Sequence, residues 1–315
     1  MTAKDGVATS GRLAEALEAH LGAGAVRKAE PLARYTALRV GGPAELLVVA
    51  EEVAALRAAA ELAWQHGVAC RILGGGSNAL VSDAGVRGLV VLNRAGKVTF
   101  GGGEVWAESG ASFSTLARRC VSRGLAGLEW AAGIPGTVGG AVVGNAGAWG
   151  GDVASVLDRV RVLEPDGTVA LWPAERMGYG YRSSVLKGQG AGGERQTVVL
   201  EALFRLQPGE AQSLEQRLAE ITQQRKSSQP PGATCGSVFK NPPGDYAGRL
   251  IEAAGLKGTS HGGAVISPVH ANFVVNQGGA TAGDVKALID LARREVEAGT
   301  GVRLELEIEL LGEWQ

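Results

Sequence analysis

The spacing of apolar residues predicts helices and strands that alternate near the amino end of the chain. Residues 11–21 carry leucines four positions apart, which is typical of an amphipathic helix. The segments that follow predict a β-α-β unit and one further strand: a strand at 45–50, an alanine-rich helix at about 51–65, and strands at 70–73 and 88–92.

The middle of the chain, from 98 to 206, reads as short strands joined by glycine turns, with a helical piece near 113–123. After 210 the pattern changes to apolar residues at helical spacing, and this helix is expected to end before the SSQPPG stretch that starts at 227. We therefore place one domain boundary near 210 and another near 93.

The carboxy-terminal part predicts one more helix and a closing strand. Thr281 and Asp284 stand three residues apart, as in a capping box, where a hydroxyl and a carboxylate satisfy free amides at a helix start. The helix should run from about 282 to 298 with these residues on one apolar face: Val285, Leu288, Ile289, Ala292 and Val296. Residues 302–312, VRLELEIELLG, alternate strictly between apolar and polar positions, which predicts a half-buried strand.

Charge and cysteine content narrow the class of protein. The 31 Lys and Arg residues balance 32 Asp and Glu residues, so no global field favours nucleic acid or a membrane surface. The apolar runs are shorter than the roughly 20 residues of a spanning helix, and the amino end lacks a signal-peptide layout. Three cysteines without metal-type spacing make disulfides and a metal site improbable. We expect a soluble cytoplasmic protein with no nucleic-acid or membrane partner.

Glycine is the most informative residue type, with 49 copies and no Gly-X-Y period. It gathers in clusters at 74–76, 101–103, 133–151 and 188–193. Clustered glycine indicates backbone with positive φ or in close approach to another group. Most such clusters are turns between strands, and one or two are candidates to hold a ligand.

The first candidate is the segment 71–83, RILGGGSNALVSD. Gly74, Gly76 and Ala79 match the dinucleotide fingerprint of a Rossmann fold in spacing. That fingerprint must open a helix, whereas a glycine turn and a new strand follow here within ten residues. We interpret the segment as a strand-to-strand loop whose amides form an anion nest suited to a pyrophosphate, with Ser77 and Asn78 as added donors. A tight turn without ligand is the alternative.

The second candidate is the segment 133–151, GIPGTVGGAVVGNAGAWGG. Each glycine in a helix interior costs about 1 kcal/mol relative to alanine, so we expect no stable helix here. Its bare amides are expected to be held by tertiary contacts and to lie against a flat or charged ligand.

The third candidate is Ser237, within ATCGSVFKNPP at 233–243. Its hydroxyl is open to four interpretations: nucleophile, proton donor, phosphate ligand or turn residue. No histidine is close in sequence, which disfavours the nucleophile. A base from a distant part of the sequence that activates the serine is the alternative.

Four motifs in one order resemble a known family. The segments LGGGSNALVSD, GLEWAAGIPGTVGGAVVGNAGAWGG, YRSSVLK and GSVFKNP are similar to those of the UDP-N-acetylenolpyruvoylglucosamine reductases, also called UDP-N-acetylmuramate dehydrogenases. The resemblance covers the chain from about 34 to 312. The spacing from Arg182 to Ser237 resembles the compact subtype, which lacks a loop with a substrate-clamping tyrosine. Leu186 departs from the family's usual aromatic residue in YRxSxFK.

The resemblance implies an α+β fold with an FAD-binding region of two α+β subdomains, like that of the vanillyl-alcohol oxidase superfamily, and a C-terminal α+β substrate-binding domain. We expect an N-terminal helical extension at 1–30, the two FAD-binding subdomains at 31–93 and 94–210, and the substrate-binding domain at 211–315. The implied reaction uses NADPH and non-covalent FAD to reduce the enolpyruvyl ether of UDP-N-acetylglucosamine to UDP-N-acetylmuramate, a cell-wall precursor.

The resemblance also assigns catalytic roles. Arg182 would stabilise the charge that develops on the substrate's carboxylate, since its planar fork matches a carboxylate at two points. Ser237 would donate the proton to the α-carbon. Glu307 would help to hold the enolate form, and because a carboxylate beside another is repulsive, we expect a raised pKa or a tight ion pair with Arg182.

Binding residues are expected within these motifs and at two positions outside them, Arg225 before SSQPP and His270 in SPVHANFVVN. The expected FAD-binding residues are Leu73, Gly74, Gly75, Gly76, Ser77, Asn78, Leu80, Pro135, Gly136, Thr137, Gly139, Gly140 and Asn145. The expected residues for the UDP-sugar are Tyr181, Arg225, Lys240, Asn241 and His270. Nothing near Cys235 would activate its thiol.

Two other classes of function fit parts of the sequence. One is an FAD-dependent oxidase or dehydrogenase of the same superfamily that acts on a sugar or hydroxy acid. The other is a regulatory module that binds a sugar nucleotide without turnover, although simple binding has no need of a proton donor. A Rossmann hydride-transfer enzyme ranks last, because no helix is expected after 76.

Overall fold

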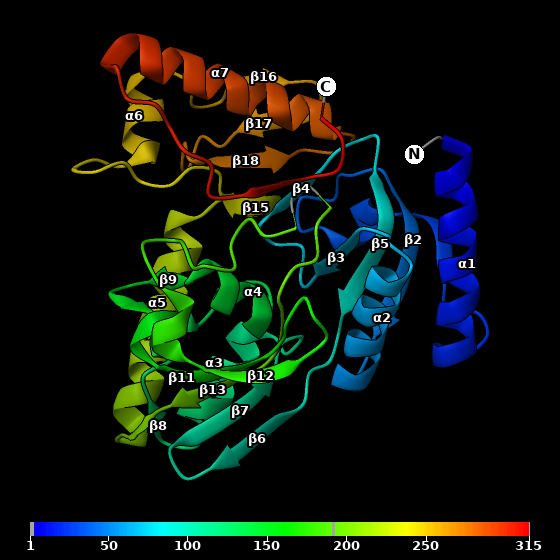
Figure 1. Cartoon of the computed structure of the whole chain (residues 1–315). Helices are drawn as coiled ribbons and strands as arrows, with labels where there is room; N and C mark the ends of the chain where they lie inside the picture. The colour runs from blue at the N-terminus through cyan, green and yellow to red at the C-terminus, as the bar shows by residue number, and fades with distance from the viewer. Residues whose placement is uncertain (1–2, 191–192, 315) are drawn as a thin grey trace. The chain divides into compact units, whose positions relative to one another are not determined.

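The computed structural model describes residues 3–190 and 193–314 and has mixed α and β content, which confirms the predicted α+β class. Two compact units are built from interleaved segments (Figure 1). Unit 1 holds the chain up to Glu30, Ala44–Gly75 and Arg87–Gln223; unit 2 holds Pro31–Pro43, Gly76–Val86 and the chain from Gln224 onward. The predicted division at 93 and 210 stays a prediction, and part of the 188–193 glycine cluster lies outside the described residues.

The first sheet of unit 1 packs with two helices around one apolar core. Its strands run in the order β1 (Arg27–Pro31), β2 (Pro43–Ala50), β5 (Val86–Asn93) and β3 (Cys70–Leu73), with β3 parallel to β5. Helices α1 (Ala3–Leu21) and α2 (Val53–Gln65) cover it through buried residues that include Leu13, Leu17 and Leu56. The predicted elements at 11–21, 45–50, 51–65, 70–73 and 88–92 are confirmed within two residues at most boundaries, with α1 starting earlier.

The second sheet of unit 1 is antiparallel. Its strands run in the order β12 (Val169–Pro173), β11 (Leu157–Leu163), β13 (Val198–Arg205), β7 (Glu104–Glu108) and β6 (Val98–Gly101). Helix α3 (Phe113–Val121) and helix α4 (Val138–Gly144) share its apolar core. Short strand pairs β8 (Leu125–Ala126) with β14 (Gln207–Pro208) and β9 (Gly147–Ala148) with β10 (Gly151–Asp152), together with single 3-10 turns at Glu129–Ala131, Val153–Ser155 and Ala174–Met177, complete this part.

Helix α4 overturns the expectation that the second glycine segment forms no helix. The Thr137 side chain accepts a hydrogen bond from the amide of Gly140, and Asn145 ends the helix with φ of 44°. Gly139 lies so close to Ser109 that a Cβ at Gly139 would sit 2.9 Å from the Cβ of Ser109. Packing of the bare backbone against strand neighbours thus outweighs the low helix propensity of glycine.

This contact predicts opposite effects for two alanine substitutions within α4. Gly139→Ala should lower the free energy of unfolding by about 1–3 kcal/mol, since the new methyl overpacks against Ser109. Gly144→Ala, whose Cβ would meet nothing within 4 Å, should raise it by about 0.5–1 kcal/mol through helix propensity. Denaturant unfolding of both variants measures the two effects, and equal stability would contradict the packing argument.

Unit 2 is a smaller layer of strands and helices. Its sheet has the order β15 (Ala233–Ser237), β18 (Phe273–Asn276), β17 (Ala264–Ile266) and β16 (Ser260–His261). Helices α6 (Ala247–Ala253) and α7 (Ala282–Thr300) pack on it, and a separate parallel pair joins β4 (Ala79–Val81) to β19 (Glu309–Leu311). The 3-10 turn Leu32–Tyr35 also belongs here.

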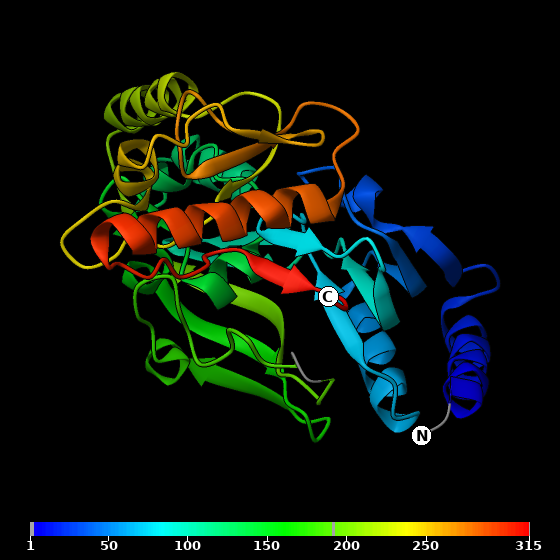
Figure 2. The same cartoon turned by 90° about the horizontal axis from the view of Figure 1, so that it is seen from above.

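Helix α7 confirms its prediction in detail. The capping box of Thr281 and Asp284 is formed on both sides, and the five apolar residues predicted for one face are all buried. Asp83 adds two more bonds at this helix start, because its carboxylate accepts from the amides of Ala282 and Gly283. After α7 the chain turns back and runs beside the helix, as Figure 2 shows in red and orange.

Two predicted boundaries were wrong: the end of the helix after 210 and the extent of the strand at 302–312. Helix α5 (Ala211–Ser228) continues through the two serines before the prolines, where the Ser227 and Ser228 hydroxyls donate to the carbonyl of Gln224. The strand predicted over 302–312 forms only as β19, because Leu306 makes a single bridge to Phe239 and the chain bends at 307–308 before it reaches β4.

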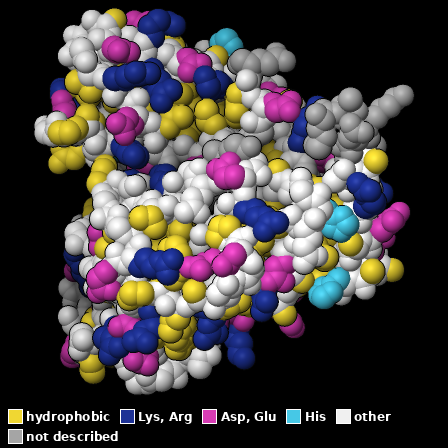
Figure 3. Space-filling view, viewed as in Figure 1, with side chains coloured by type: hydrophobic (Ala, Val, Ile, Leu, Met, Phe, Trp, Pro, Cys, Tyr) yellow, Lys and Arg dark blue, Asp and Glu magenta, His cyan; other side chains and the backbone are white. Residues whose placement is uncertain are grey.

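The surface shows acidic and basic side chains interspersed on the face seen in Figure 3. This mixture agrees with the near-zero net charge of the sequence. Among the described residues, every helix is either too short or too polar to cross a bilayer.

Candidate active site

Unit 1 brings the two glycine-rich segments into contact. A Cβ at Gly74 would lie 2.3 Å from the hydroxyl oxygen of Thr137, and one at Gly75 would lie 2.8 Å from the Cα of Gly136. The guanidinium of Arg94 donates to the carbonyl of Gly74 and fixes this end of the loop. The Thr137 side chain lies against Gly74, and at Gly75 and Gly136 two backbones meet with no side chain between them, so both segments need glycine here. Successive amides of such loops can bind the pyrophosphate of a dinucleotide.

The first glycine segment passes from one unit to the other. Gly75 closes a segment of unit 1, and Gly76 opens a segment of unit 2, where a Cβ would lie 2.1 Å from the carbonyl oxygen of Tyr35. No helix follows; the next elements are β4 and β5, which confirms the argument against a Rossmann loop. Leu80 is fully buried in the core of unit 2, and Leu73 is buried in β3. Their predicted contacts with FAD remain predictions.

Arg182 lies in a two-residue turn between Gly180 and Ser183, which form a bridge. Its φ is 53°, a left-handed conformation that is costly for a residue with a side chain. Strain of this kind is found where surrounding structure holds a functional side chain in place. The adjacent Tyr181 ring is exposed, and its centroid lies 5.5 Å from the guanidinium carbon of Arg182.

Hydrogen bonds from both sides of this turn attach it to the end of α4. The Asn145 side chain donates to the carbonyl of Gly180 at 3.0 Å, and the Ser184 hydroxyl donates to the carbonyl of Val143 at 2.6 Å. The Tyr179 hydroxyl donates to the carbonyl of Val142, and burial raises the pKa of this phenol. The glycine segment thus holds the turn that carries Arg182. Asn145, predicted to bind FAD, uses its side chain in this attachment.

Ser237 is the last residue of β15 and is half-buried. It follows Gly236, whose φ of 80° turns the chain, and it pairs with Phe273 of β18. Within the described ranges its hydroxyl makes no hydrogen bond to the protein.

The residues after Ser237 are locked by Asn272. The carbonyl oxygen of Asn272 accepts from the amide of Val238 at 2.8 Å. Its side chain then accepts from the amide of Phe239 at 2.9 Å and donates to the Phe239 carbonyl at 2.8 Å. Asn272 is buried, so these bonds are protected from water. The backbone that carries Ser237 is therefore held rigidly on its carboxyl side.

Glu307 is half-buried and lies beside the same segment. Its amide donates to the carbonyl of Val238 at 2.9 Å, and its own carbonyl accepts from the side chain of Asn78 at 3.1 Å. Unit 2 thus places the backbone of Glu307 against Val238, the residue that follows Ser237. Arg182 belongs to unit 1.

Two predicted substrate residues also lie on this stretch. Lys240 pairs with Glu305, with 3.5 Å between Nζ and Oε2, and its amide donates to the Glu305 carbonyl. The side-chain oxygen of Asn241 accepts from the amide of Ala247 at the start of α6. Asn241 therefore has a structural contact in addition to its predicted role.

The remaining predicted substrate residues lie on other elements of unit 2. Arg225, in α5, donates to the side chain of Gln229. His270 accepts a hydrogen bond from the amide of Asn272 through Nδ1, and burial lowers the pKa of its imidazole, with a smaller effect from Lys257. The bond to Nδ1 means that His270 helps to fix the loop that carries Asn272.

The cysteines are structural. Cys70, Cys120 and Cys235 are free and buried, and burial raises the pKa of each thiol to about 12. The expectation that nothing activates Cys235 is in line with this. Leu186, where the family usually has an aromatic residue, is buried and packs within the second core of unit 1.

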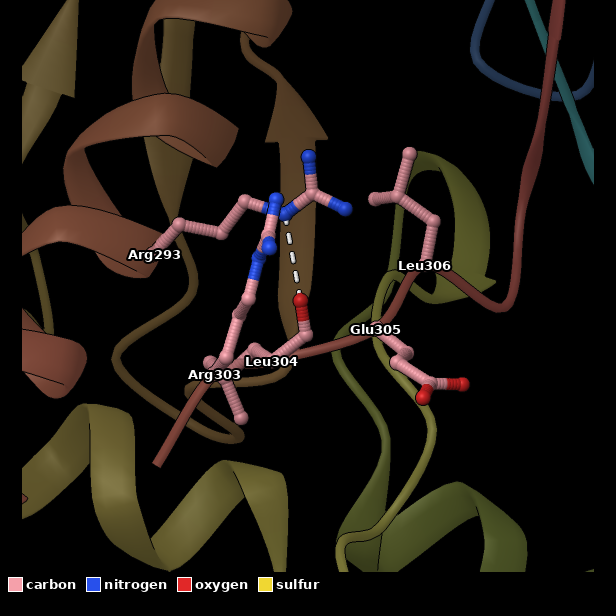
Figure 4. Close-up of a pocket in the computed structure, with 5 residues that line it drawn as sticks. All are labelled: Arg293, Arg303, Leu304, Glu305 and Leu306. Carbon is pink, nitrogen blue, oxygen red and sulfur yellow. Dashed lines mark hydrogen bonds between the residues drawn. The ribbon is translucent and has the colours of Figure 1, made fainter. Parts of the chain in front are cut away.

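One feature of unit 2 was missed by sequence reasoning. A pocket of about 460 Å³ is lined by Arg293, Arg303, Leu304, Glu305 and Leu306 (Figure 4). Arg293 comes from α7 and donates through Nε to the carbonyl of Leu304, while Arg303 has no ion pair with any described residue. Two guanidinium groups beside one carboxylate make the pocket wall net positive. The arginines stand ten residues apart, so only the return of the chain along α7 brings them together.

Two family models match parts of this chain, and named relatives are similar over most of its length. A family model described as "UDP-N-acetylenolpyruvoylglucosamine reductase, C-terminal domain" matches residues 226–311, and one described as "FAD binding domain" matches 44–171, a range that contains both glycine segments. The UDP-N-acetylenolpyruvoylglucosamine reductase of Rubrobacter xylanophilus is 47% identical over 288 residues, which is 90% of this chain and 94% of that protein. The enzyme of the same name from Chloroflexus aggregans is 45% identical over 91% of this chain and 97% of its own length.

A solved structure is similar over nearly the whole chain. The UDP-N-acetylenolpyruvylglucosamine reductase from Thermus caldophilus superposes with a TM-score of 0.78 at 38% identity, covering 91% of this chain and 100% of that chain. The matches extend over both units and over all four motifs, so they do not rest on a shared cofactor domain alone.

Proposed function

Because this chain belongs to the UDP-N-acetylenolpyruvoylglucosamine reductase family, we propose that it uses NADPH to reduce the enolpyruvyl ether of UDP-N-acetylglucosamine. The product would be UDP-N-acetylmuramate, a precursor of peptidoglycan made in the cytoplasm. The relatives' name supports the UDP-sugar substrate, and the match to an FAD-binding domain supports a flavoenzyme.

The contact of the two glycine segments fits FAD. Gly74 and Gly75 are packed against Thr137 and Gly136 with no space for a Cβ, so only glycine lets the two segments meet, and the amides of both would hold FAD. Bound FAD would accept a hydride from NADPH and deliver it to the substrate's double bond. The chain's own residues then have two tasks, which are to stabilise negative charge and to supply a proton.

Arg182 would perform the first task. Addition of hydride to the enol ether leaves negative charge on the α-carbon, delocalised into the adjoining carboxylate. The guanidinium would donate two parallel hydrogen bonds to that carboxylate, and they strengthen as the charge grows. Three hydrogen bonds attach the turn that holds Arg182 to the end of α4, which fixes its backbone before substrate binds.

Ser237 would perform the second task by donating the proton of its Oγ to the α-carbon. A hydroxyl is a weak acid in water, but an enolate-like carbon is a strong base, so the transfer is favourable. Glu307 would help to hold the enolate form. The observation that carries this proposal is the hydrogen bond from the Glu307 amide to the carbonyl of Val238, because it brings Glu307 next to the residue that follows Ser237 within unit 2.

The test separates the two half-reactions. The purified protein should be yellow, NADPH should bleach it, and only the enolpyruvyl ether of UDP-N-acetylglucosamine should restore the colour rapidly in the absence of oxygen. Rapid recolouring by sugars or hydroxy acids would instead favour an FAD-dependent oxidase or dehydrogenase. Protein that stays colourless after addition of FAD would contradict the proposal.

A further inference from the structure

Glu307 is held by two segments that are far apart in sequence. On its amino side, its amide donates to Val238, next to Ser237. On its carboxyl side, its carbonyl accepts from the side chain of Asn78, which lies in the first segment predicted to bind FAD. The backbone of Glu307 is therefore held by the predicted cofactor loop and by the residue that follows Ser237.

Asn78 makes this connection with its backbone and its side chain together. Its carbonyl accepts from the amide of Glu309 at 2.8 Å, which starts the parallel ladder between β4 and β19. Its side-chain Nδ2 donates to the carbonyl of Glu307 at 3.1 Å, where a further ladder bond would otherwise come from a backbone amide. One residue thus fixes the main chain on both sides of Ile308.

The strand that follows makes similar bonds farther along. The Ser82 amide donates to the carbonyl of Leu311, and its hydroxyl donates to the carbonyl of Glu313 at 2.6 Å. These bonds align the chain around β4 and β19, and their acceptors are Leu311 and Glu313 rather than Glu307. Asn78 is the polar side chain of 77–83 for which the structure gives a bond to the Glu307 carbonyl.

We propose that Asn78, which lies in the predicted cofactor loop, is a positioning residue for Glu307. The order of that loop and the orientation of the Glu307 carboxylate are therefore coupled. This inference rests on the proposed function for the importance of Glu307 in the reaction. The coupling is reciprocal, because a bond that steadies Glu307 when the loop is ordered also steadies the loop when Glu307 is held.

Hydrogen exchange in the flavin-loaded enzyme tests the positioning without substrate. In Asn78→Ala, amides of residues 307–309 should exchange about 10-fold faster, the size expected for loss of one hydrogen bond that steadies a local segment. Ser82→Ala, the matched control at the other end of β4, should change their exchange less than about two-fold. Equal rates in Asn78→Ala and the wild type would overturn the proposal.

The half-reactions then test the consequence for catalysis. In the flavin-loaded enzyme, Asn78→Ala should slow reoxidation by the enolpyruvyl nucleotide about 10-fold in rate constant with little change in KM. Asn78→Asp keeps the size but sets a carboxylate against a carbonyl, so it should be no faster than Asn78→Ala. Rescue by aspartate would overturn the role of the donated bond. Faster exchange with unchanged reoxidation would overturn the role in positioning for catalysis.

The two hypotheses fail in different ways. If the wild-type enzyme is not reoxidised by the enolpyruvyl nucleotide, the proposed function fails. Faster exchange in Asn78→Ala would then still support the hold of Asn78 on Glu307, because that measurement uses no substrate.

Discussion

Replacing Ser237 by alanine should slow reoxidation by the enolpyruvyl substrate by about 10²–10⁴, the usual contribution of a positioned general acid. Bleaching by NADPH should stay nearly unchanged, because no proton goes to the α-carbon in that half. The fold should tolerate the change, since the hydroxyl makes no hydrogen bond to the described part of the protein. Stopped-flow absorbance of the flavin measures both rates.

Thr234 offers a matched control on the same strand. Its hydroxyl is buried and has no hydrogen-bond partner among the described residues. Thr234→Val therefore removes a hydroxyl from β15 without breaking a bond, and both rates should stay within about two-fold of the wild type. Loss of both half-reactions to the same extent in Ser237→Ala would count against a proton donor and in favour of a structural serine.

Replacing Arg182 should give the second large effect, again confined to reoxidation. Arg182→Ala should slow that step by about 10²–10³, the size found when a fixed donor to a developing negative charge is lost. Arg182→Lys should recover part of the rate, because an ammonium keeps the charge but lacks the two-point fork. Both arginine and lysine bear the cost of the left-handed φ, so this pair isolates the side-chain head group.

Arg176 is the control for Arg182. It lies in the 3-10 turn Ala174–Met177, pairs with Glu164, and its guanidinium carbon lies 3.8 Å from the Trp172 ring centroid. Arg176→Ala removes an equal charge from an exposed position, and reoxidation should change less than about two-fold. An Arg182→Ala enzyme that reoxidises at the wild-type rate would remove Arg182 from the proposed chemistry.

Local sequence patterns were sufficient for elements whose stability is local. The apolar face of α7, its capping box and the strands β2, β3 and β5 follow from spacing alone, because burial of one face and satisfaction of end amides are short-range requirements. The same reasoning failed at 302–312. Strict alternation there predicts a strand, but only Glu309–Leu311 finds a partner strand, β4, from far earlier in the chain.

The sequence by itself determined the α+β class, the order of the motifs and the residue types available for chemistry. Only the tertiary structure decided that Gly139 belongs to a helix. The absence of a side chain lets the helix approach Ser109 closely, and this packing outweighs the low helix propensity of glycine. It also decided that the Glu307 amide bonds to the carbonyl of Val238, next to Ser237, and that the Asn78 side chain bonds to the Glu307 carbonyl across 229 residues of sequence. Such contacts are set by packing and by hydrogen bonds between distant segments, and no local pattern of side chains records them.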